Sequence, residues 1–509
     1  MEPLNRRILL ISPPFYRLYR DTYSYVGVPL GLAYLAGAIR QETDWQVLVH
    51  CGDINLRRRR RKRMSYMYGA GFDNYRKALG DLSAPVWREL ESTIRSHRPA
   101  VLGISSMSQT FASACNVARL AKNVDRGIQV IVGGPHPTTV AHEVLANKDI
   151  DFFVKGEGER AIVQFLQTLE ESGDLSQVAG LGFRGPGGVV ENPPQDYIQD
   201  LDRLCFPHRV LPHTLKDFAK YPLDAFANVF VTRGCPFRCS FCGSHNIWGN
   251  TVRFRSPENI VEELRSLQQM GVNHVRFEDD TFGVTRRSLR DICVAIRDGC
   301  PGLSWGCEIH AGLIDEETLA WMKAAGCIWI SLGIESGSNE ILRLIRKQIT
   351  IEQALEACVL VKRSGFGLST FFMIGFPQDT GQTIRDTVAA MEASKSDNIV
   401  LSIFTPYPGT ETYDLCREMG SISGDFDPAQ YNHLSPANNF CSAIPNDRFS
   451  VIAGNLVRQV ERYNAKRRSL KVRLRRSLNW RALRRLPHRV LGNLGVVLPT
   501  CERKSDAPA

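Results

Sequence analysis

Long apolar runs are missing from this chain. Hydrophobic residues make up 43% of its 509 positions, yet no stretch approaches the ~20 consecutive apolar residues that a helix needs to cross a bilayer. The apolar part of the N-terminal segment MEPLNRRILLISPPF is too short for the core of a signal peptide, and a first β-strand explains it better. We therefore expect a cytoplasmic protein of about two to four domains, in which cysteines stay reduced.

Acidic residues are missing from two strongly basic segments. The formal net charge of +10 comes from seven consecutive basic residues at 57–63 and from twelve Lys and Arg residues at 462–489. Neither segment has the stacking aromatics or the module of a nucleic-acid-binding protein, so we expect no nucleic acid partner. The first is expected as a solvated loop with a helical tail. The second has apolar residues at helical spacing, which predicts a basic helix that packs on the protein or docks on an anionic membrane surface or carrier protein.

Strands alternate with helices over the first 185 residues. The alternation predicts parallel strands, right-handed crossovers and a doubly wound, Rossmann-like α/β sheet over residues 1–185. Residues 186–227 are rich in Pro, Gly and Asp with little periodicity, and they are expected as a linker. Strands are predicted at 7–14, 45–50, 100–106, 128–134 and 150–159, with helices near 85–97, 111–123 and 138–147.

A second alternating series follows the linker. Its six strand–helix units predict a full or partial (β/α)6 barrel over residues 228–415, followed by a helical extension over 416–509. In such barrels the chemistry lies at the C-terminal ends of the strands, and polar residues gather at those ends here, Glu278, Glu308 and His310 among them. The strands of this series are predicted at 227–234, 274–280, 304–310, 327–335, 368–375 and 398–407.

One short loop lacks a fourth cysteine. Three of the chain's 14 cysteines fall within eight positions, as Cys235, Cys239 and Cys242. A [4Fe–4S] cluster takes four ligands, so three thiolates leave one iron open to a small molecule. A structural zinc site uses four ligands, usually two pairs, and no second pair is present. The loop therefore favours a cluster over zinc, and the scattered cysteines are expected to be small buried residues.

The cysteine spacing, with Phe241 before the last cysteine and a strand before the loop, resembles the radical S-adenosylmethionine superfamily over residues 228–410. The resemblance implies that the three cysteines ligate the cluster and that S-adenosylmethionine chelates the open iron. An electron from a flavodoxin- or ferredoxin-type donor would then cleave S-adenosylmethionine to methionine and a 5′-deoxyadenosyl radical.

Further site residues follow from the same resemblance. The backbone of Phe241–Gly243 is expected to flank the adenine. The family's Gly-Gly-Glu segment after the second strand is replaced here by FEDDTFG, which assigns Asp279 and Asp280 to methionine binding. The stretches GIES (333–336) and MIGFP (373–377) match segments that border the cofactor, with Glu335 as the polar contact. For each carboxylate, a salt bridge at the barrel rim is the alternative.

A second cofactor is indicated in the N-terminal domain. Ser105 and Ser106 follow its third strand, and Gly133 and Gly134 follow its fourth, at the edge where open α/β sheets bind ligands. Alone, these residues suit an ordinary turn as well as a flat macrocycle with a nucleotide tail. Together with ISPP, VPLGLAYLAGAI, VGGPHPT and KGEGE, they are similar to the cobalamin-binding radical S-adenosylmethionine enzymes, the class B methylases, over residues 6–410.

One motif of cobalamin domains is absent. The Asp-x-His-x-x-Gly sequence that supplies a histidine to cobalt would follow the first strand, where this chain reads SPPFYRLYRDTYSYVG without a histidine. Relatives of this class also lack it, so the resemblance implies a corrinoid without a protein imidazole on cobalt.

The resemblance implies a C-methyltransferase. The deoxyadenosyl radical would remove hydrogen from an unactivated carbon of a small molecule, a secondary metabolite or lipid-like compound, and methylcobalamin would supply the methyl group. One alternative keeps the cofactors but cyclises, contracts or rearranges the substrate. A cobalamin-free methylthiotransferase would need a second cysteine set in the N-terminal domain, where only Cys51 and Cys115 lie. A non-enzymatic basic binding protein would leave the cysteine loop unexplained.

Overall fold

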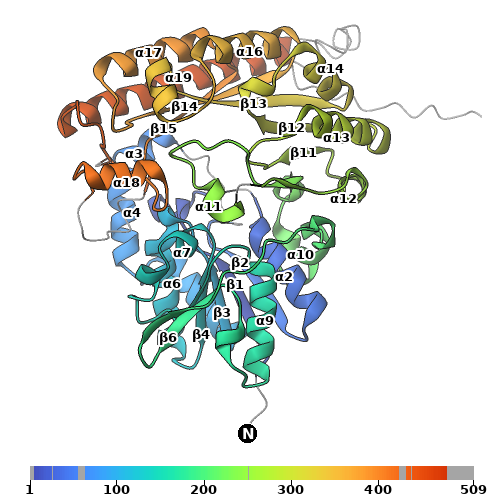
Figure 1. Ribbon diagram of the computed structural model, residues 1–509, viewed down its shortest axis with the longest axis vertical. Coiled ribbons are helices and arrows are strands. Elements are labelled where there is room, and N and C mark those ends of the chain that lie inside the picture. Colours follow the sequence, from blue (N-terminus) through green and yellow to red (C-terminus); the bar gives the residue numbers. More distant parts are fainter. Residues whose placement is uncertain are drawn as a thin grey trace, which may run out of the picture.

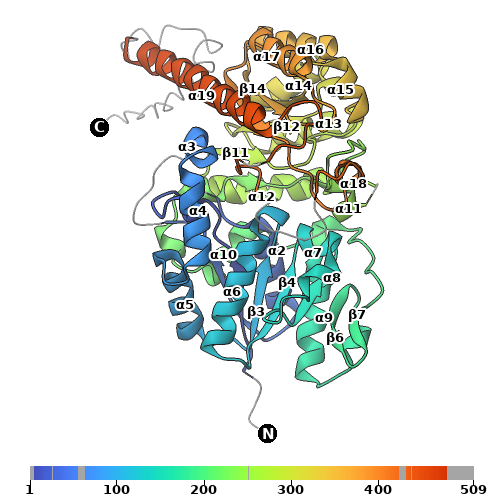
Figure 2. The same cartoon turned by 90° about the vertical axis from the view of Figure 1, so that its left-hand side faces the viewer.

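Two α/β halves are stacked along the long axis of the molecule (Figures 1 and 2). The N-terminal half contains one sheet and the C-terminal half contains another, and the short helix α11 (Ser244–Trp248) lies between them in both views. This computed structural model describes residues 5–25, 27–55, 63–249, 251–422, 432–436 and 438–477.

The N-terminal sheet has seven strands in the order β2-β1-β3-β4-β5-β6-β7. The first five are parallel, and β6 and β7 add antiparallel strands at one edge. The order 2-1-3-4-5 is a doubly wound arrangement in which the strand order reverses between β1 and β3, and it confirms the predicted fold. The strands are β1 (Arg7–Ser12), β2 (Gln46–Cys51), β3 (Val101–Ser105), β4 (Gln129–Gly133), β5 (Phe152–Val154), β6 (Leu181–Gly185) and β7 (Gly188–Glu191).

Helices cover both faces of this sheet, and that explains the continuous apolar run in β1. Ile8 and Leu10 pack on one face and Leu9 and Ile11 on the other. The first face is covered by α2 (Leu30–Glu42), α9 (Gly158–Glu170) and α10 (Pro207–Thr214). The second is covered by α4 (Gly71–Gly80), α5 (Pro85–His97) and α6 (Phe111–Val124). Shorter helices are α1 (Tyr16–Tyr19), α3 (Met64–Tyr68), α7 (Pro135–Thr139) and α8 (Ala141–Val144).

The structure differs from the predicted elements in two segments. Residues 186–227, expected as a linker, contain β7 and α10, and α10 packs against α2 and β2. Strand β7 is fully exposed and therefore lacks an apolar alternation, and α10 contains Pro212, which lowers its helical signal. The single helix expected at 138–147 is divided into α7 and α8 at Val140.

The C-terminal half is an open, parallel six-stranded sheet in the order β15-β14-β13-β12-β11-β8, the partial barrel that the sequence predicted. Its strands are β8 (Asn228–Val229), β11 (His274–Phe277), β12 (Ser304–Ile309), β13 (Cys327–Glu335), β14 (Gly367–Ile374) and β15 (Asn398–Ile403). Its helices are α12 (Pro257–Gln269), α13 (Arg286–Gly299), α14 (Glu316–Ala324), α15 (Asn339–Leu344), α16 (Ile351–Arg363) and α17 (Gly381–Ala393).

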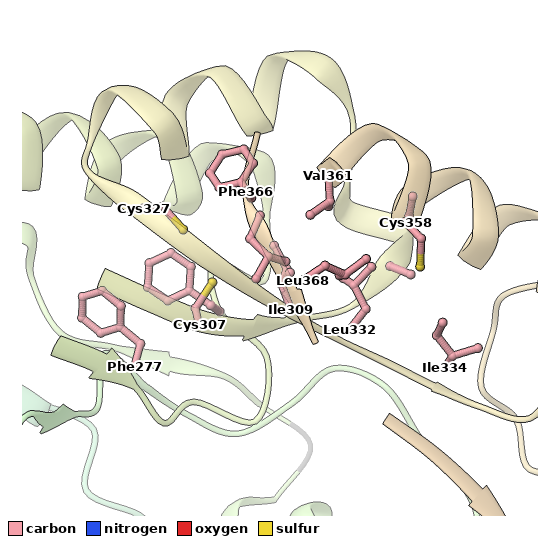
Figure 3. Close-up of a cluster of buried hydrophobic side chains, with 14 of the residues drawn as sticks. Phe277, Cys307, Ile309, Cys327, Leu332, Ile334, Cys358, Val361, Phe366 and Leu368 are labelled. Atoms are coloured by element: carbon pink, nitrogen blue, oxygen red, sulfur yellow. The ribbon is translucent and has the colours of Figure 1, made fainter. Parts of the chain in front are cut away.

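Apolar side chains fill the space between this sheet and its outer helices. Figure 3 shows Phe277, Cys307 and Cys327 on the strands and Cys358 on α16 within one cluster. Of the ten described cysteines outside the 235–242 loop, eight are buried, and Cys115 and Cys205 are partly buried. These thiols therefore act mainly as small core residues, as expected from their scattered positions.

The C-terminal extension contributes α18 (Glu411–Glu418) and α19 (Asn446–Ser477). Helix α19 packs on the barrel, where the side-chain amide of Asn464 donates to the carbonyl of Ile399 at 2.7 Å and accepts from its N–H at 2.9 Å. The expected basic helix at 462–489 lies outside the described residues from 478 onward, as do residues 57–62 of the first basic segment. No helix among the described residues has the length and apolarity that a membrane span requires.

Candidate active site

The three cysteines lie on a closed loop at the junction of the two halves. Strands β9 (Thr232–Arg233) and β10 (Arg253–Phe254) pair antiparallel at the base of this loop, which spans residues 234–252. Gly234 starts the loop with a φ of 107°, and a Cβ there would lie 2.6 Å from the carbonyl oxygen of Thr251. Only glycine fits this close approach, so Gly234 fixes where the cysteine loop leaves the strand.

Contacts from the barrel hold the loop. The N–H of Ser240 donates to the carbonyl of Ile345 at 3.0 Å, and its hydroxyl accepts from the Thr412 hydroxyl at 3.0 Å. The ring of Phe237 stacks on His310, with ring centroids 3.8 Å apart. The segment between Cys235 and Cys242 is thus fixed from several sides.

Charged groups lie beside the thiols. Lys347 is buried and forms an ion pair with Glu335 at 3.0 Å. Burial alone would lower the pKa of Lys347. The negative charges of Glu335 and of the neighbouring Cys239 have the larger combined effect, so the pKa is raised. Burial raises the pKa of Cys235 and Cys242 to about 11, and the charge of Asp280 adds to the shift. These thiols stay protonated near neutral pH until a metal displaces the proton.

The two predicted methionine-binding carboxylates have different environments. Asp279 is 3% exposed, and its Oδ1 accepts hydrogen bonds from the N–H of Val231 at 3.0 Å and the hydroxyl of Thr232 at 2.6 Å. Burial raises the pKa of Asp279 to about 7, and these hydrogen bonds oppose the shift. Asp279 therefore holds the chain that leads into the cysteine loop. Asp280 instead accepts a hydrogen bond from Ser244, directly after the cysteines.

The barrel also presents an ion-pair cluster at its C-terminal strand ends. Arg276 lies 3.2 Å from Glu278 and 2.9 Å from Glu308, and more than half of its side chain is exposed. Burial raises the pKa of Tyr25, and the charges of Glu278 and Arg276 also act on it. The N-terminal segment that contains Tyr25 therefore lies over this polar part of the barrel.

A cavity of about 270 Å³ lies at the C-terminal ends of β1, β3, β4 and β5. Of the four residues assigned to a ligand in the sequence, Ser105, Gly133 and Gly134 line this cavity, whereas Ser106 is fully buried and supports the turn through its backbone. A Cβ added to Gly133 would meet no atom within 4 Å, so this glycine leaves open space in the cavity. Among the described residues, no histidine lines it.

The walls of this cavity come from both halves. Most are apolar or bare glycine backbone, from α2, α9 and the strand ends, and Phe230, Arg233, Ile247 and Trp248 close it from the barrel side. Ile247 and Trp248 belong to α11, which is part of the cysteine loop. The cysteine loop and the cavity of the N-terminal half therefore share a wall.

Models of known protein families match both halves of the chain. The radical SAM superfamily model matches residues 229–391, and the B12 binding domain model matches residues 16–166. An uncharacterized methyltransferase of Pyrococcus horikoshii is 30% identical over 412 residues, which are 80% of this chain and 82% of the relative. The chain belongs to the cobalamin-binding radical S-adenosylmethionine enzymes.

Other relatives of this radical S-adenosylmethionine enzyme differ in their reactions. The anaerobic magnesium-protoporphyrin IX monomethyl ester cyclase of Rubrivivax gelatinosus is 29% identical over 70% of this chain and 64% of the cyclase. The cytidylyl-2-hydroxyethylphosphonate methyltransferase of Streptomyces wedmorensis is 23% identical over 82% of this chain and 83% of that enzyme. The solved structure of the methyltransferase TsrM from Kitasatospora setae, with cobalamin and a [4Fe–4S] cluster bound, shares the fold (TM-score 0.64, 17% identity, 85% of each chain).

The enzyme uses a [4Fe–4S] cluster, S-adenosylmethionine and cobalamin, and its residues fit all three. Three unpaired thiols stand on one loop beside the Lys347 cation. The open space at Gly133 and the apolar walls suit the nucleotide tail of a corrinoid.

Sequence reasoning missed several residues of this enzyme's cavity. Gly31 and Tyr34 on α2, and Glu157 and Glu159 after β5, line it together with Trp248. The motifs VPLGLAYLAGAI and KGEGE were recognised as a pattern, but no single residue in them was assigned. The sequence does offer one signal for them: Gly156 and Gly158 alternate with Glu157 and Glu159 just after a strand. A glycine-rich turn at that position can bring the backbone close to a ligand.

Proposed function

We propose that this enzyme methylates an unactivated carbon of a small molecule, a secondary metabolite or lipid-like compound. When bound, the cluster with S-adenosylmethionine supplies a radical that removes hydrogen, and cobalamin supplies the methyl group. One observation carries the proposal: α11 belongs to the cysteine loop and also closes the cavity of the cobalamin-binding half. The two proposed cofactor sites would therefore have α11 in common.

In this proposal Cys235, Cys239 and Cys242 hold the cluster, and Phe241 and Gly243 border the adenine. Phe241 packs edge-on against Phe376 of the MIGFP segment, which supports a shared wall there. Asp280 and the Glu335–Lys347 pair are charged groups that act on the thiols, and they would orient the methionine part. The electron would come from a flavodoxin- or ferredoxin-type donor.

The cavity near Ser105, Gly133 and Gly134 would receive the nucleotide tail of the corrinoid. Its volume of about 270 Å³ suits an aromatic nucleotide but not a whole macrocycle, so the ring would lie at its mouth, between the halves. The polar cluster of Arg276, Glu278 and Glu308 would then face the substrate. Exclusion of water from this space would protect reactive carbon centres.

The second candidate function is cyclisation or rearrangement without methyl transfer, favoured by the 29% identity with the Rubrivivax gelatinosus cyclase. The deciding experiment incubates the reconstituted enzyme anaerobically with extracts of its own cells and S-adenosylmethionine that carries a trideuterated methyl group. Methylation predicts a new product that contains the label on carbon. A new product without label, formed together with 5′-deoxyadenosine, would overturn methyl transfer and support the alternative.

We further propose that the basic segments dock on an anionic membrane surface. Ser65, two residues after the first segment, donates its N–H at 2.9 Å to Glu461 of α19, which precedes the second, so the described flanks of the two segments lie close together. A surface cavity there is lined by Arg20, Arg63 and Arg458, and none of these arginines pairs with a carboxylate in the part of the chain that the structure describes.

Vesicle sedimentation tests this docking. Vesicles that contain phosphatidylglycerol should bind the protein at low salt, and Arg458→Glu should weaken binding about tenfold, because each basic residue near such a surface contributes about 1 kcal/mol and the substitution also introduces repulsion. Arg448→Glu, at another exposed position of α19, is the matched control. Equal binding by both variants, or none by the wild type, would exclude this partner.

A further inference from the structure

Two buried arginines stand at the base of the cysteine loop. Arg233 is the last residue before the loop and Arg253 is the first after it, and the two are direct partners in the β9–β10 pair. Both are more than nine-tenths buried. Whatever holds these two side chains therefore holds both ends of the segment that carries Cys235, Cys239 and Cys242.

One carboxylate of the other half holds both arginines. Oε1 of Glu157, which follows β5, accepts a hydrogen bond from Nη1 of Arg233 at 2.6 Å, and its Oε2 lies 2.9 Å from Nη1 of Arg253. Glu159 of the same turn accepts from Nη2 of Arg233 at 2.5 Å. Glu157 is 4% exposed, so the contact is a buried bridge between the halves.

The connection between the halves is fixed at the same point. Glu157 also accepts the N–H of Ile198 at 2.6 Å, and Arg253 donates to the carbonyl of Ile198 at 2.7 Å. The negative charges of Glu157 and Glu159 are neutralised by the positive charges of Arg233 and Arg253 in this buried site. Removal of one partner from such a set leaves a buried charge uncompensated, which costs far more than the loss of an exposed pair such as Lys155–Glu191.

The same residues line the cavity assigned to the corrinoid. Glu157, Glu159 and Arg233 all contribute to its wall. The guanidinium of Arg233 lies over the rings of Tyr34 and Trp248, with its carbon 5.4 Å and 5.2 Å from their centroids. Residues 235–242, which carry the three cysteines, are not part of this wall. Apart from direct contact with a ligand at the cavity mouth, an effect of the cavity on these residues would pass through the base of the loop or through α11.

We propose that Glu157 is a positioning residue that couples filling of the cavity to ordering of the cysteine loop. A ligand that packs against the wall restricts the Glu157–Arg233–Arg253 bridge, and the bridge fixes both ends of the loop. The coupling is reciprocal, so an assembled cluster strengthens ligand binding by the same factor. This inference rests on the proposed function, because it requires a corrinoid in the cavity.

Hydrogen–deuterium exchange of the full-length, cluster-free protein tests the coupling, with hydroxocobalamin as the probe. In the wild type, hydroxocobalamin should slow exchange in peptides that cover residues 235–242 about tenfold. In Glu157→Gln, at hydroxocobalamin concentrations that saturate the protein, protection of these peptides should fall below about twofold. Peptides that cover the cavity wall should stay protected in both proteins.

A second measurement uses reciprocity. The dissociation constant of hydroxocobalamin should be about tenfold lower with the cluster than without it in the wild type, and nearly unchanged by the cluster in Glu157→Gln. Glu159→Gln alters only one hydrogen bond to Arg233 and should therefore have an intermediate effect. This variant replaces Glu157→Gln in the test if Glu157→Gln does not fold. The control Glu191→Gln removes an exposed ion pair of the same domain and should behave as wild type.

The outcomes separate the two proposals. If the wild type retains hydroxocobalamin but its 235–242 peptides exchange at the same rate with and without it, the coupling is refuted and the cofactor assignment stands. If Glu157→Gln keeps full protection and the full cluster effect, Glu157 is not the coupling residue. If the wild type retains no corrinoid, both proposals fail.

Discussion

Cys239→Ala should abolish assembly of the iron–sulfur cluster and cleavage of S-adenosylmethionine. Cys239 is the most buried of the three loop cysteines, and it lies beside Lys347 in a loop fixed by the Ser240–Ile345 hydrogen bond. Loss of one of the three thiolates would leave two irons without a protein ligand. The loop cannot replace the lost ligand. After anaerobic reconstitution, iron should fall from about four per chain to near zero, and 5′-deoxyadenosine should be undetectable.

Cys205→Ala is the matched control for this result. Cys205 is a partly buried free cysteine outside the loop, and its variant should keep the wild-type iron content and cleavage rate. Because alanine is small, both variants should fold, which melting curves of the unreconstituted proteins would verify. Full iron content and S-adenosylmethionine cleavage in Cys239→Ala would contradict the assignment of the cluster to this loop.

Gly133→Leu should weaken cobalamin binding about 100-fold while leaving the iron–sulfur cluster intact. A side chain at Gly133 enters open space at the end of β4 and meets no protein atom within 4 Å at its Cβ, so the variant should fold. The added isobutyl group would occupy part of a cavity of only about 270 Å³. A steric conflict of about 3 kcal/mol lowers affinity about 100-fold, measured by cobalt content after desalting and by titration with hydroxocobalamin.

The control for this change is Gly80→Leu. Gly80 ends α4, its added Cβ also meets nothing within 4 Å, and it does not line the cavity. This variant should bind cobalamin as the wild type does. Wild-type affinity in Gly133→Leu would show that the corrinoid binds elsewhere, and loss of both iron and cobalt would indicate misfolding instead.

Strong local patterns made the fold predictable from the sequence. The apolar run in β1 is buried on both faces, as a central parallel strand must be, and the same pattern recurs in the other central strands. The weaker elements escaped prediction because their signal is weak for physical reasons. Strand β7 is exposed along its whole length, and α10 contains an internal proline.

The candidate site was predictable in part. Residues whose side chains carry distinctive chemistry, such as the three cysteines, are visible in any sequence as candidate ligands. Ser105, Gly133 and Gly134 could be placed at the ligand edge because strand order fixes that edge. Glu157 and Arg233 could not be paired, because 76 positions separate them in sequence and the contact depends on how the two halves meet. Asp279 was assigned to the cofactor, yet its nearest donors are the backbone and hydroxyl of the neighbouring strand.

The most direct test of the central claim is the joint iron and cobalt content of the purified protein. The protein would be isolated anaerobically, reconstituted with iron and sulfide, mixed with hydroxocobalamin and desalted, and its metals and visible spectrum recorded. We predict about four irons and about one cobalt per chain, with corrinoid absorbance that co-elutes with the protein. Four irons without cobalt would contradict the account, since the N-terminal half would then hold no corrinoid and the methyl-transfer mechanism would have no methyl donor.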